Sequence, residues 1–192
     1  ANGSCSANIC SLLNVSVDIR KWQPESKNLR SDFHDFNIVG GFLTYFDIDK
    51  NLQIIHTLYP NITEFSLLTD NSLGGVTMQA LVRDKVAGMK GIKMNYIDGR
   101  TETYASMLQI IRKMPSDMAL LLGTWRVDWN DNFSIGNSSM QVNENNPTLP
   151  VFSISGIGMN GLAIGGYYPD FRHDGERLAE ICMAYLERFE PQ

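Results

Sequence analysis

The chain has 192 residues and a formal net charge of −5 at pH 7, with 43% hydrophobic and 19% charged residues. A chain of this length and composition forms one substantial folded domain, or a domain with an appendage. The acidic balance and the lack of a basic cluster argue against a nucleic-acid partner. No run of about 20 apolar residues, the length that a transmembrane helix needs, is present. The first residues have neither the basic start nor the apolar centre of a signal peptide, so we expect a mature or excised fragment.

The N-terminal region does not share the pattern of the rest of the chain. We interpret 1–37 as an irregular arm, or the remainder of a preceding lobe, and 38–190 as an α/β lobe. Cys5 and Cys10 can close a small loop in an oxidising compartment, and no second pair of ligands accompanies them to make a zinc site. Cys182 lies in a helical pattern, where we expect it to be buried as a small apolar residue.

From residue 38 onward, apolar runs alternate with helical patterns. We expect strands at 38–46, 64–69, 92–97, 118–125, 149–155 and 162–168. We expect helices at 48–59, 74–88, 104–114 and 170–189. This alternation predicts a three-layer α/β/α, Rossmann-like lobe, with a mostly parallel sheet of five or six strands and helices on both faces.

Apolar residues at helical spacing define the buried faces of three of these helices. The faces comprise Ile48, Leu52, Ile55 and Tyr59 in the first helix, Tyr104, Met107, Leu108, Ile111 and Met114 in the third, and Leu178, Ile181, Cys182, Tyr185 and Phe189 in the last. Asp47 is the expected N-cap of the first helix, and Pro60 ends it. Pro115 ends the third helix in the same way.

The segment Gly156–Gly161 matches the G-x-G-x-x-G pattern of dinucleotide-binding proteins. That pattern binds a pyrophosphate only where a helix begins in the glycine turn, because the helix N-terminus faces the phosphates. Here a β-type run closed by a proline follows the glycines. We therefore predict that no nucleotide binds at this turn.

Catalytic motifs are also missing from the sequence. His34, His56 and His173 are far apart, and no metalloprotease, nucleophile-elbow or P-loop pattern is present. Asp47 and Asp49 are explained by helix capping and by the helix dipole. The sequence therefore favours a non-catalytic protein that needs no metal or cofactor.

Polar and aromatic residues follow three expected strands, at the edge of the sheet where ligands bind in open α/β folds. The candidate ligand-binding residues in these loops are Asp70, Asn71, Ser72, Trp125, Asp128, Ser155 and Met159. Together they offer apolar walls with a few polar groups, as small-molecule sites do. The alternative is that they are ordinary turns, because Asp, Asn and Ser are common turn residues.

Trp125 ends the aliphatic run 118–124 where the strand leaves the sheet, and Arg126 and Asp128 follow it in a polar loop. A tryptophan ring in this position suits stacking on a ring-shaped ligand, with its N–H free to donate a hydrogen bond. The alternative places Trp125 in the core at the edge of the sheet.

The order of the segments 37–75, 118–128 and 149–186 resembles the C-terminal half of the ABC-transporter substrate-binding-like family. The form that it resembles is the extracytoplasmic sensor domain of bacterial histidine kinases, notably of hybrid two-component systems. The matching motifs are the turn Asp70-Asn71-Ser72, the glycine-containing strand after 161, and the helix with Gly175-Glu176-Arg177-Leu178-Ala179-Glu180. Each motif is loose, and their order is the specific part.

The resemblance implies a periplasmic-binding-protein architecture of two Rossmann-like lobes with a ligand in the cleft between them. The N-terminal lobe is absent or truncated here. By this resemblance, the residues on the cleft side of the lobe would be Asp70, Asn71, Ser72, Trp125 and Gly156. The residues near the hinge would be Tyr167 and Tyr168.

The resemblance also implies a function. It predicts a periplasmic domain that binds an unknown small molecule and signals by conformational change to a membrane-embedded kinase. Segments outside this chain would provide the membrane attachment, and the parent receptor could form a homodimer. The alternatives are a solute-binding protein of an ABC transporter and, against the lack of catalytic motifs, an enzyme built on the same sheet.

Overall fold

The structure is a computed structural model that describes residues 6–7, 18–24, 27–28, 46–134 and 138–188. Within these residues it contains five helices, a four-stranded sheet and a two-stranded sheet. The two-stranded sheet pairs β1 (Ser6–Ala7) antiparallel with β2 (Lys27–Asn28). The expected strand at 38–46, apart from Phe46, lies outside the described residues, and so do Cys5 and Cys10, whose pairing was expected to close a loop.

The larger sheet is entirely parallel and has the strand order β4-β3-β5-β6. Its strands are β3 (Glu64–Thr69), β4 (Lys93–Asp98), β5 (Met118–Leu122) and β6 (Val151–Ser153). Leu67 of β3 pairs with Tyr96 of β4 on one side and Leu121 of β5 on the other. Every residue of β5 is buried, as expected for a central parallel strand covered on both faces. The predicted α/β fold with a mostly parallel sheet is confirmed.

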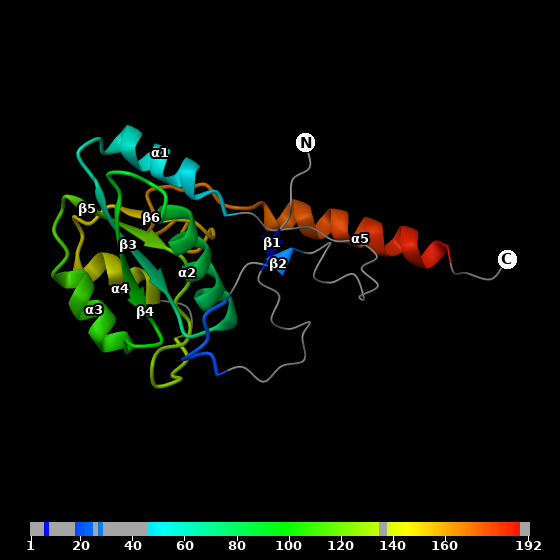
Figure 1. The fold of residues 1–192 in the computed structure, drawn as a ribbon, viewed down its shortest axis with the longest axis horizontal. Helices are drawn as coiled ribbons and strands as arrows, with labels where there is room; N and C mark the ends of the chain where they lie inside the picture. The colour runs from blue at the N-terminus through cyan, green and yellow to red at the C-terminus, as the bar shows by residue number, and fades with distance from the viewer. Residues whose placement is uncertain (1–5, 8–17, 25–26, 29–45, 135–137, 189–192) are drawn as a thin grey trace.

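Two pairs of helices cover the two faces of this sheet (Figure 1). On one face α1 (Ile48–Leu58) and α2 (Leu73–Val86) pack on a core that includes Phe65, Leu121 and Phe152. On the other face α3 (Tyr104–Arg112) and α4 (Ser138–Asn145) pack on a core that includes Leu120 and Leu122. Alternate residues of β5 thus face opposite cores, which gives the predicted three layers.

The helix boundaries follow from local sequence. Asp47 caps α1 by accepting a hydrogen bond from the Lys50 N–H at 3.0 Å. Thr103 and Ser106 form a reciprocal capping box at the start of α3. The predicted faces of both helices are buried at Ile48, Leu52, Ile55, Met107 and Ile111.

The expected strand at 162–168 is wrong, since the segment forms turns and joins the sheet only through one bridge from Gly165 to Phe152. At the start of the segment, the Leu162 and Ala163 N–H groups both donate to the Gly158 carbonyl at 2.9 Å and form a turn. At its end, the Asn51 side chain binds the Tyr167 backbone. The Tyr167 N–H donates to Asn51 Oδ1 at 2.8 Å, and Asn51 Nδ2 donates to the Tyr167 carbonyl at 2.8 Å. These groups are therefore not available for strand pairing.

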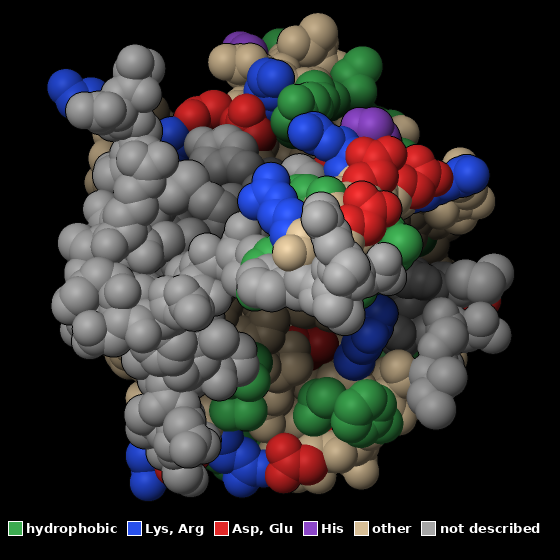
Figure 2. All heavy atoms as spheres, turned by 90° about the vertical axis from the view of Figure 1, so that its right-hand side faces the viewer, with side chains coloured by type: hydrophobic (Ala, Val, Ile, Leu, Met, Phe, Trp, Pro, Cys, Tyr) green, Lys and Arg blue, Asp and Glu red, His purple; other side chains and the backbone are tan. Residues whose placement is uncertain are grey.

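The last helix, α5 (Phe171–Glu187), projects away from the sheet (Figure 1) and buries none of its residues. The expected burial of Cys182 is wrong, because this residue is exposed. Hydrophobic side chains of α5 such as Leu178 and Leu186 are also exposed. On the face from which α5 projects, Lys, Arg, Asp and Glu side chains are intermixed, with hydrophobic side chains exposed between them (Figure 2).

Candidate functional site

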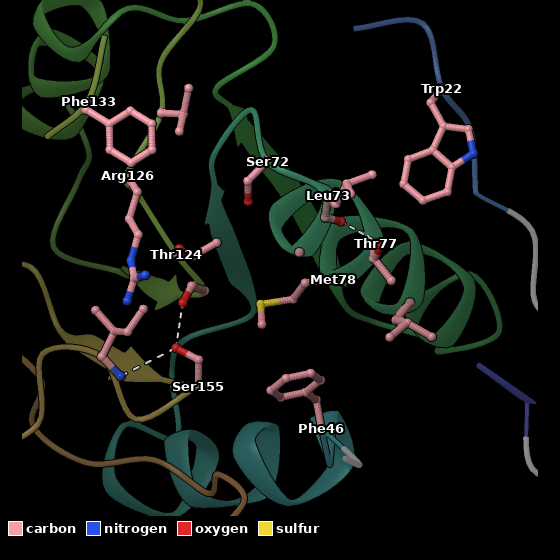
Figure 3. Close-up of a pocket in the computed structure, with 15 residues that line it drawn as sticks. Trp22, Phe46, Ser72, Leu73, Thr77, Met78, Thr124, Arg126, Phe133 and Ser155 are labelled. Carbon is pink, nitrogen blue, oxygen red and sulfur yellow. Dashed lines mark hydrogen bonds between the residues drawn. The ribbon is translucent and has the colours of Figure 1, made fainter. Parts of the chain in front are cut away.

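A hollow of about 610 Å³ lies beyond the carboxyl ends of β3, β5 and β6, beside the start of α2. This is the edge of a parallel sheet at which ligands bind in open α/β folds. Its walls are mainly apolar and aromatic, with Trp22, Phe46, Met78 and Phe133 among them. Four hydroxyl groups and one charged side chain, Arg126, complete it (Figure 3).

Asp70 organises this edge of the sheet although it is itself buried, with 1% of its surface exposed. Its carboxylate accepts four hydrogen bonds: from the Ser72 N–H and hydroxyl, from the Thr124 hydroxyl at 3.1 Å, and from the Arg126 N–H at 2.8 Å. It therefore ties the loop after β5 to the start of α2. The predicted site residue Asp70 therefore does not line the hollow, but its hydrogen bonds hold in place three residues that do.

The close approach of α2 to Asp70 depends on a glycine. A Cβ on Gly75 would overlap the carboxylate and the backbone of Asp70. The neighbouring Gly74, by contrast, faces open space at the hollow, since a Cβ there would come no closer than 3.8 Å to Ser72 Oγ.

All four hydroxyl groups that line the hollow donate their hydrogens to the protein. Ser72 and Thr124 donate to Asp70, Thr77 donates to the Leu73 carbonyl at 2.6 Å, and Ser155 donates to the Gly123 carbonyl at 2.5 Å. A hydroxyl has one hydrogen and two lone pairs. These groups therefore offer only acceptor lone pairs to a ligand.

Arg126 is the only ionisable side chain among the described residues that line the hollow. Its backbone is fixed by Asp70 and by the Ser134 N–H, which donates to the Arg126 carbonyl at 2.8 Å. Its guanidinium has no hydrogen-bond or ion-pair partner among the described residues, and it extends into the hollow on the side of Thr124 and Ser155 (Figure 3). Within the described part of the chain, the hollow thus has one positive charge without a partner.

Trp125 does not line the hollow, because its side chain turns to the opposite side of the chain from that of Arg126. It is 5% exposed and packs in the α3/α4 core with Leu68, Met107 and Leu122. Its indole N–H is buried and has no hydrogen-bond partner among the residues that the structure describes. This placement corrects the interpretation of Trp125 as a stacking surface and agrees with the alternative of a core residue.

Asp128 and Asn71 are also buried, at 2% and 7% exposed. The Asp128 carboxylate accepts hydrogen bonds from the N–H groups of Tyr104, Asn130 and Asn132. Burial alone would raise the pKa of Asp128, but these donors outweigh it and hold the pKa below its ordinary value. Asn71 Nδ2 donates to Asp131 at 3.1 Å. Both residues therefore order loops and do not reach the hollow.

Of the remaining predicted site residues, Ser72 and Ser155 line the hollow, whereas Gly156 and Tyr167 line a second hollow of about 830 Å³. The two hollows share Ser155 and Ile157, and the second one extends to the start of α5. Met159 lines neither of them.

The glycine turn at residues 156–161 lacks the feature that a dinucleotide site needs. Gly156 and Gly158 have φ angles of +87° and +80°, which glycine adopts without strain. The next helix is α5, which begins ten residues later at Phe171. These glycines therefore serve a tight turn at the wall of the second hollow.

Sequence reasoning missed Trp22, which reaches the hollow from the N-terminal arm. Residues 18–24 are held on the lobe by two arginines. Arg20 donates to the Trp129 carbonyl at 2.8 Å and pairs with Asp131 at 2.6 Å, and Arg100 donates to the Trp22 carbonyl at 2.9 Å. No local pattern signals this contact, because the partners are about 80 to 110 positions apart.

Phe46, Met78, Thr124, Arg126 and Phe133 also line the hollow and were not predicted as site residues. Of these residues, only Thr124 and Arg126 could have been identified from the sequence, because they flank Trp125 at the carboxyl end of a predicted strand. Because side chains of successive residues point in opposite directions there, the pattern located the loop but not which of its residues face the hollow.

Among the described residues there is no cluster of three or more His, Cys, Asp or Glu side chains that could hold a metal ion. In the same part of the chain, none of the helices combines the length and apolar character needed to cross a bilayer. The chain matches no family model, no curated protein and no solved structure.

Proposed function

We propose that this chain binds a small molecule in the hollow at the carboxyl edge of its sheet, as the ligand-sensing domain of a bacterial two-component histidine kinase. The observation that carries the proposal is the hollow itself, with aromatic and aliphatic walls, four hydroxyl acceptors and the Arg126 guanidinium, which has no partner among the described residues. This combination of apolar area with few, fixed polar groups is typical of small-molecule sites. The resemblance of segment order supports the sensor assignment, with the domain outside the cytoplasm.

The hydrogen-bond pattern supports binding over catalysis. A serine or threonine nucleophile needs a neighbouring base that accepts its proton. Ser155 and Thr77 donate to backbone carbonyls, which are not bases of this kind. Asp70 accepts from Ser72 and Thr124, but its two oxygens already bind four donors. The hydroxyl groups of the hollow are thus fixed by hydrogen bonds and are not arranged as nucleophiles beside a base.

The position of α5 supports a signalling role. The second hollow borders Asp170, Phe171 and Arg172 at the start of α5, and it shares Ser155 and Ile157 with the first hollow. A ligand that displaces this shared wall would also act on the base of the projecting helix. The competing assignment, a solute-binding protein for transport, requires binding without such a signal.

The test uses two glycine-to-tryptophan variants. Gly74 lines the hollow and has room for a Cβ, so Gly74→Trp places a large ring there. At the matched control, Gly88→Trp, no atom lies within 4 Å of the added Cβ, and this residue does not line the hollow. Pools of metabolites are screened against each protein by saturation-transfer NMR. We expect binders of the original chain to be lost with Gly74→Trp and kept with Gly88→Trp. If no binder depends on residue 74, binding at this hollow is refuted.

The sensor assignment is tested with the same variants in the intact parent protein. Ligand-dependent autophosphorylation should be present in the original and Gly88→Trp proteins and lost in Gly74→Trp. Binding at the hollow with no change in autophosphorylation, together with ligand uptake that requires the protein, would instead favour the transport assignment.

A further inference from the structure

We propose that the ligand of this hollow is an apolar monocarboxylate that carries a hydrogen-bond donor, such as a hydroxyl group, next to its carboxylate. This inference rests on the proposed binding function and specifies the class of molecule. It follows from three features of the hollow: its single charge, the orientation of its hydroxyl groups, and the separation of its polar and apolar ends.

The single charge comes from Arg126, which is fixed at its backbone and unpaired at its guanidinium among the described residues. Asp70 accepts a hydrogen bond from the Arg126 backbone N–H and from three other N–H or O–H donors, and it makes no ion pair with the Arg126 guanidinium. A guanidinium binds a carboxylate through two parallel N–H···O bonds. A phosphate, with a charge of about −1.5 to −2 at pH 7, would leave excess negative charge between apolar walls. A monocarboxylate matches the one positive charge.

The hydroxyl groups determine the second feature of the ligand. Thr124 and Ser155 lie in the same half of the hollow as the Arg126 guanidinium (Figure 3). Both hydroxyl groups donate their hydrogen bonds to protein acceptors, the Asp70 carboxylate and the Gly123 carbonyl. Their lone pairs would repel a second anionic oxygen and attract an O–H or N–H. A ligand whose carboxylate sits on Arg126 is therefore favoured if a donor lies beside that carboxylate.

The opposite half of the hollow is mainly apolar, and the Thr77 hydroxyl there donates to the Leu73 carbonyl (Figure 3). Trp22, Leu73 and Phe46 lie across from Arg126, with Met78 between them (Figure 3). An aromatic or aliphatic body of the ligand would cover this surface, and tryptophan and phenylalanine rings offer large contact areas for it. The anionic head and the apolar body of the ligand thus match opposite ends of one hollow.

The test uses four compounds with one phenyl body: 3-phenyllactate, 3-phenylpropanoate, 3-phenylpropanamide and 2-phenylethyl phosphate. Affinities for the full chain are measured by saturation-transfer NMR titration. We expect phenyllactate to bind most tightly, phenylpropanoate several-fold more weakly, and the neutral amide at least tenfold more weakly than phenyllactate. The phosphate should also bind more weakly than phenyllactate.

Arg126→Gln identifies the residue that recognises the charge. It should abolish the preference for acid over amide, whereas Arg112→Gln, at an exposed arginine on α3 outside the hollow, should leave the preference unchanged. Circular dichroism checks that both variants fold. Gly74→Trp should remove binding of all four compounds.

The outcomes separate this inference from the proposed function. If the amide or the phosphate binds as well as phenyllactate, or if no compound of the series binds, the proposed ligand class is overturned, while other binders sensitive to Gly74→Trp would keep the binding function. An acid preference that persists in Arg126→Gln overturns the assignment to Arg126. If no compound of any class binds the original chain in a way that Gly74→Trp removes, the proposed function itself is refuted.

Discussion

Helices α3 and α5 both have a stripe of apolar residues at helical spacing, but their surroundings in the fold are opposite. Met107 and Ile111 of α3 are completely buried against the sheet. Leu178 and Leu186 of α5 are 43% and 60% exposed, and α5 buries no residue. The difference shows that a stripe predicts which side of a helix can be covered, and not whether a partner covers it.

The energetic consequence is that stability should be concentrated in the sheet and in α1 to α4. A buried apolar side chain contributes through removal from water and through close packing, and neither applies to an exposed one. Substitutions in the two regions should therefore differ by several kcal/mol, and the following measurements test that difference from the largest expected effect to the smallest.

The largest effect is expected for Trp125→Ala. Because Trp125 is 5% exposed in the α3/α4 core, its truncation should lower the free energy of unfolding by about 3–5 kcal/mol. The matched control is Trp129→Ala, four positions along the same loop. Trp129 is 41% exposed and stacks with Arg20, so its loss should cost about 1 kcal/mol or less.

Urea unfolding monitored by circular dichroism measures both variants. A small effect of Trp125→Ala, or one equal to that of Trp129→Ala, would contradict the placement of Trp125 in the core. It would also restore the interpretation of Trp125 as a ligand-facing residue.

The second effect concerns two adjacent glycines at the start of α2. Gly75→Ala should destabilise the chain by about 2–3 kcal/mol, because its Cβ has no room against Asp70. Gly74→Ala should be neutral or stabilise by up to about 1 kcal/mol, because alanine is the better helix former and the space there is open. Equal melting temperatures of the two variants would show that α2 does not approach Asp70 this closely.

A third effect is expected at acid pH from Asp98. Burial alone would raise the pKa of Asp98, but hydrogen bonds from the Arg100 side chain and backbone and the charge of Arg100 outweigh it and lower the pKa. A carboxyl with a lower pKa in the folded state stabilises the fold above its unfolded pKa of about 3.9. This stabilisation is lost as the pH falls through the folded pKa.

Asp98→Asn should therefore reduce stability by about 1–3 kcal/mol at neutral pH and make the acid-unfolding curve less steep below about pH 4. Asp117→Asn, at an exposed turn, serves as the control and should change neither property. If Asp98→Asn leaves the pH dependence unaltered, the ion pair with Arg100 does not stabilise the fold.

The smallest effect is expected on α5. Leu186→Ala should change the free energy of unfolding by less than about 0.5 kcal/mol, since its side chain is 60% exposed. Ile111→Ala, on the equivalent stripe of α3, should cost about 2–5 kcal/mol. A loss of 2 kcal/mol or more for Leu186→Ala, found by the same urea titration, would mean that the α5 face is covered in solution.

Within the described residues, local sequence was sufficient for most elements of the sheet and of the helices that cover it. The caps at Asp47 and Thr103, the prolines at 60 and 115, and the aliphatic run of β5 all act over a few residues. Helix α4 was missed because its sequence has no apolar stripe; of its residues 141–145, whose side chains the structure describes, Val142 alone is buried in the core. The end of the segment 162–168 was misassigned because its backbone partner, Asn51, is more than 100 positions away.

For the candidate site, the sequence located the correct edge of the sheet but not the residues that face the hollow. Asp70, Trp125 and Asp128 have the right chemistry and lie in the right loops, yet all three are buried. Trp22 and Arg126 face the hollow because of contacts with Arg100 and Asp70, which no local pattern encodes. The sequence by itself determined β3 to β6, four of the five helices that the structure describes and the parallel character of the sheet, because capping, periodicity and burial of β5 are local properties. Only the tertiary structure decided which side chains reach a ligand, because that depends on hydrogen bonds and close packing between residues far apart in the chain.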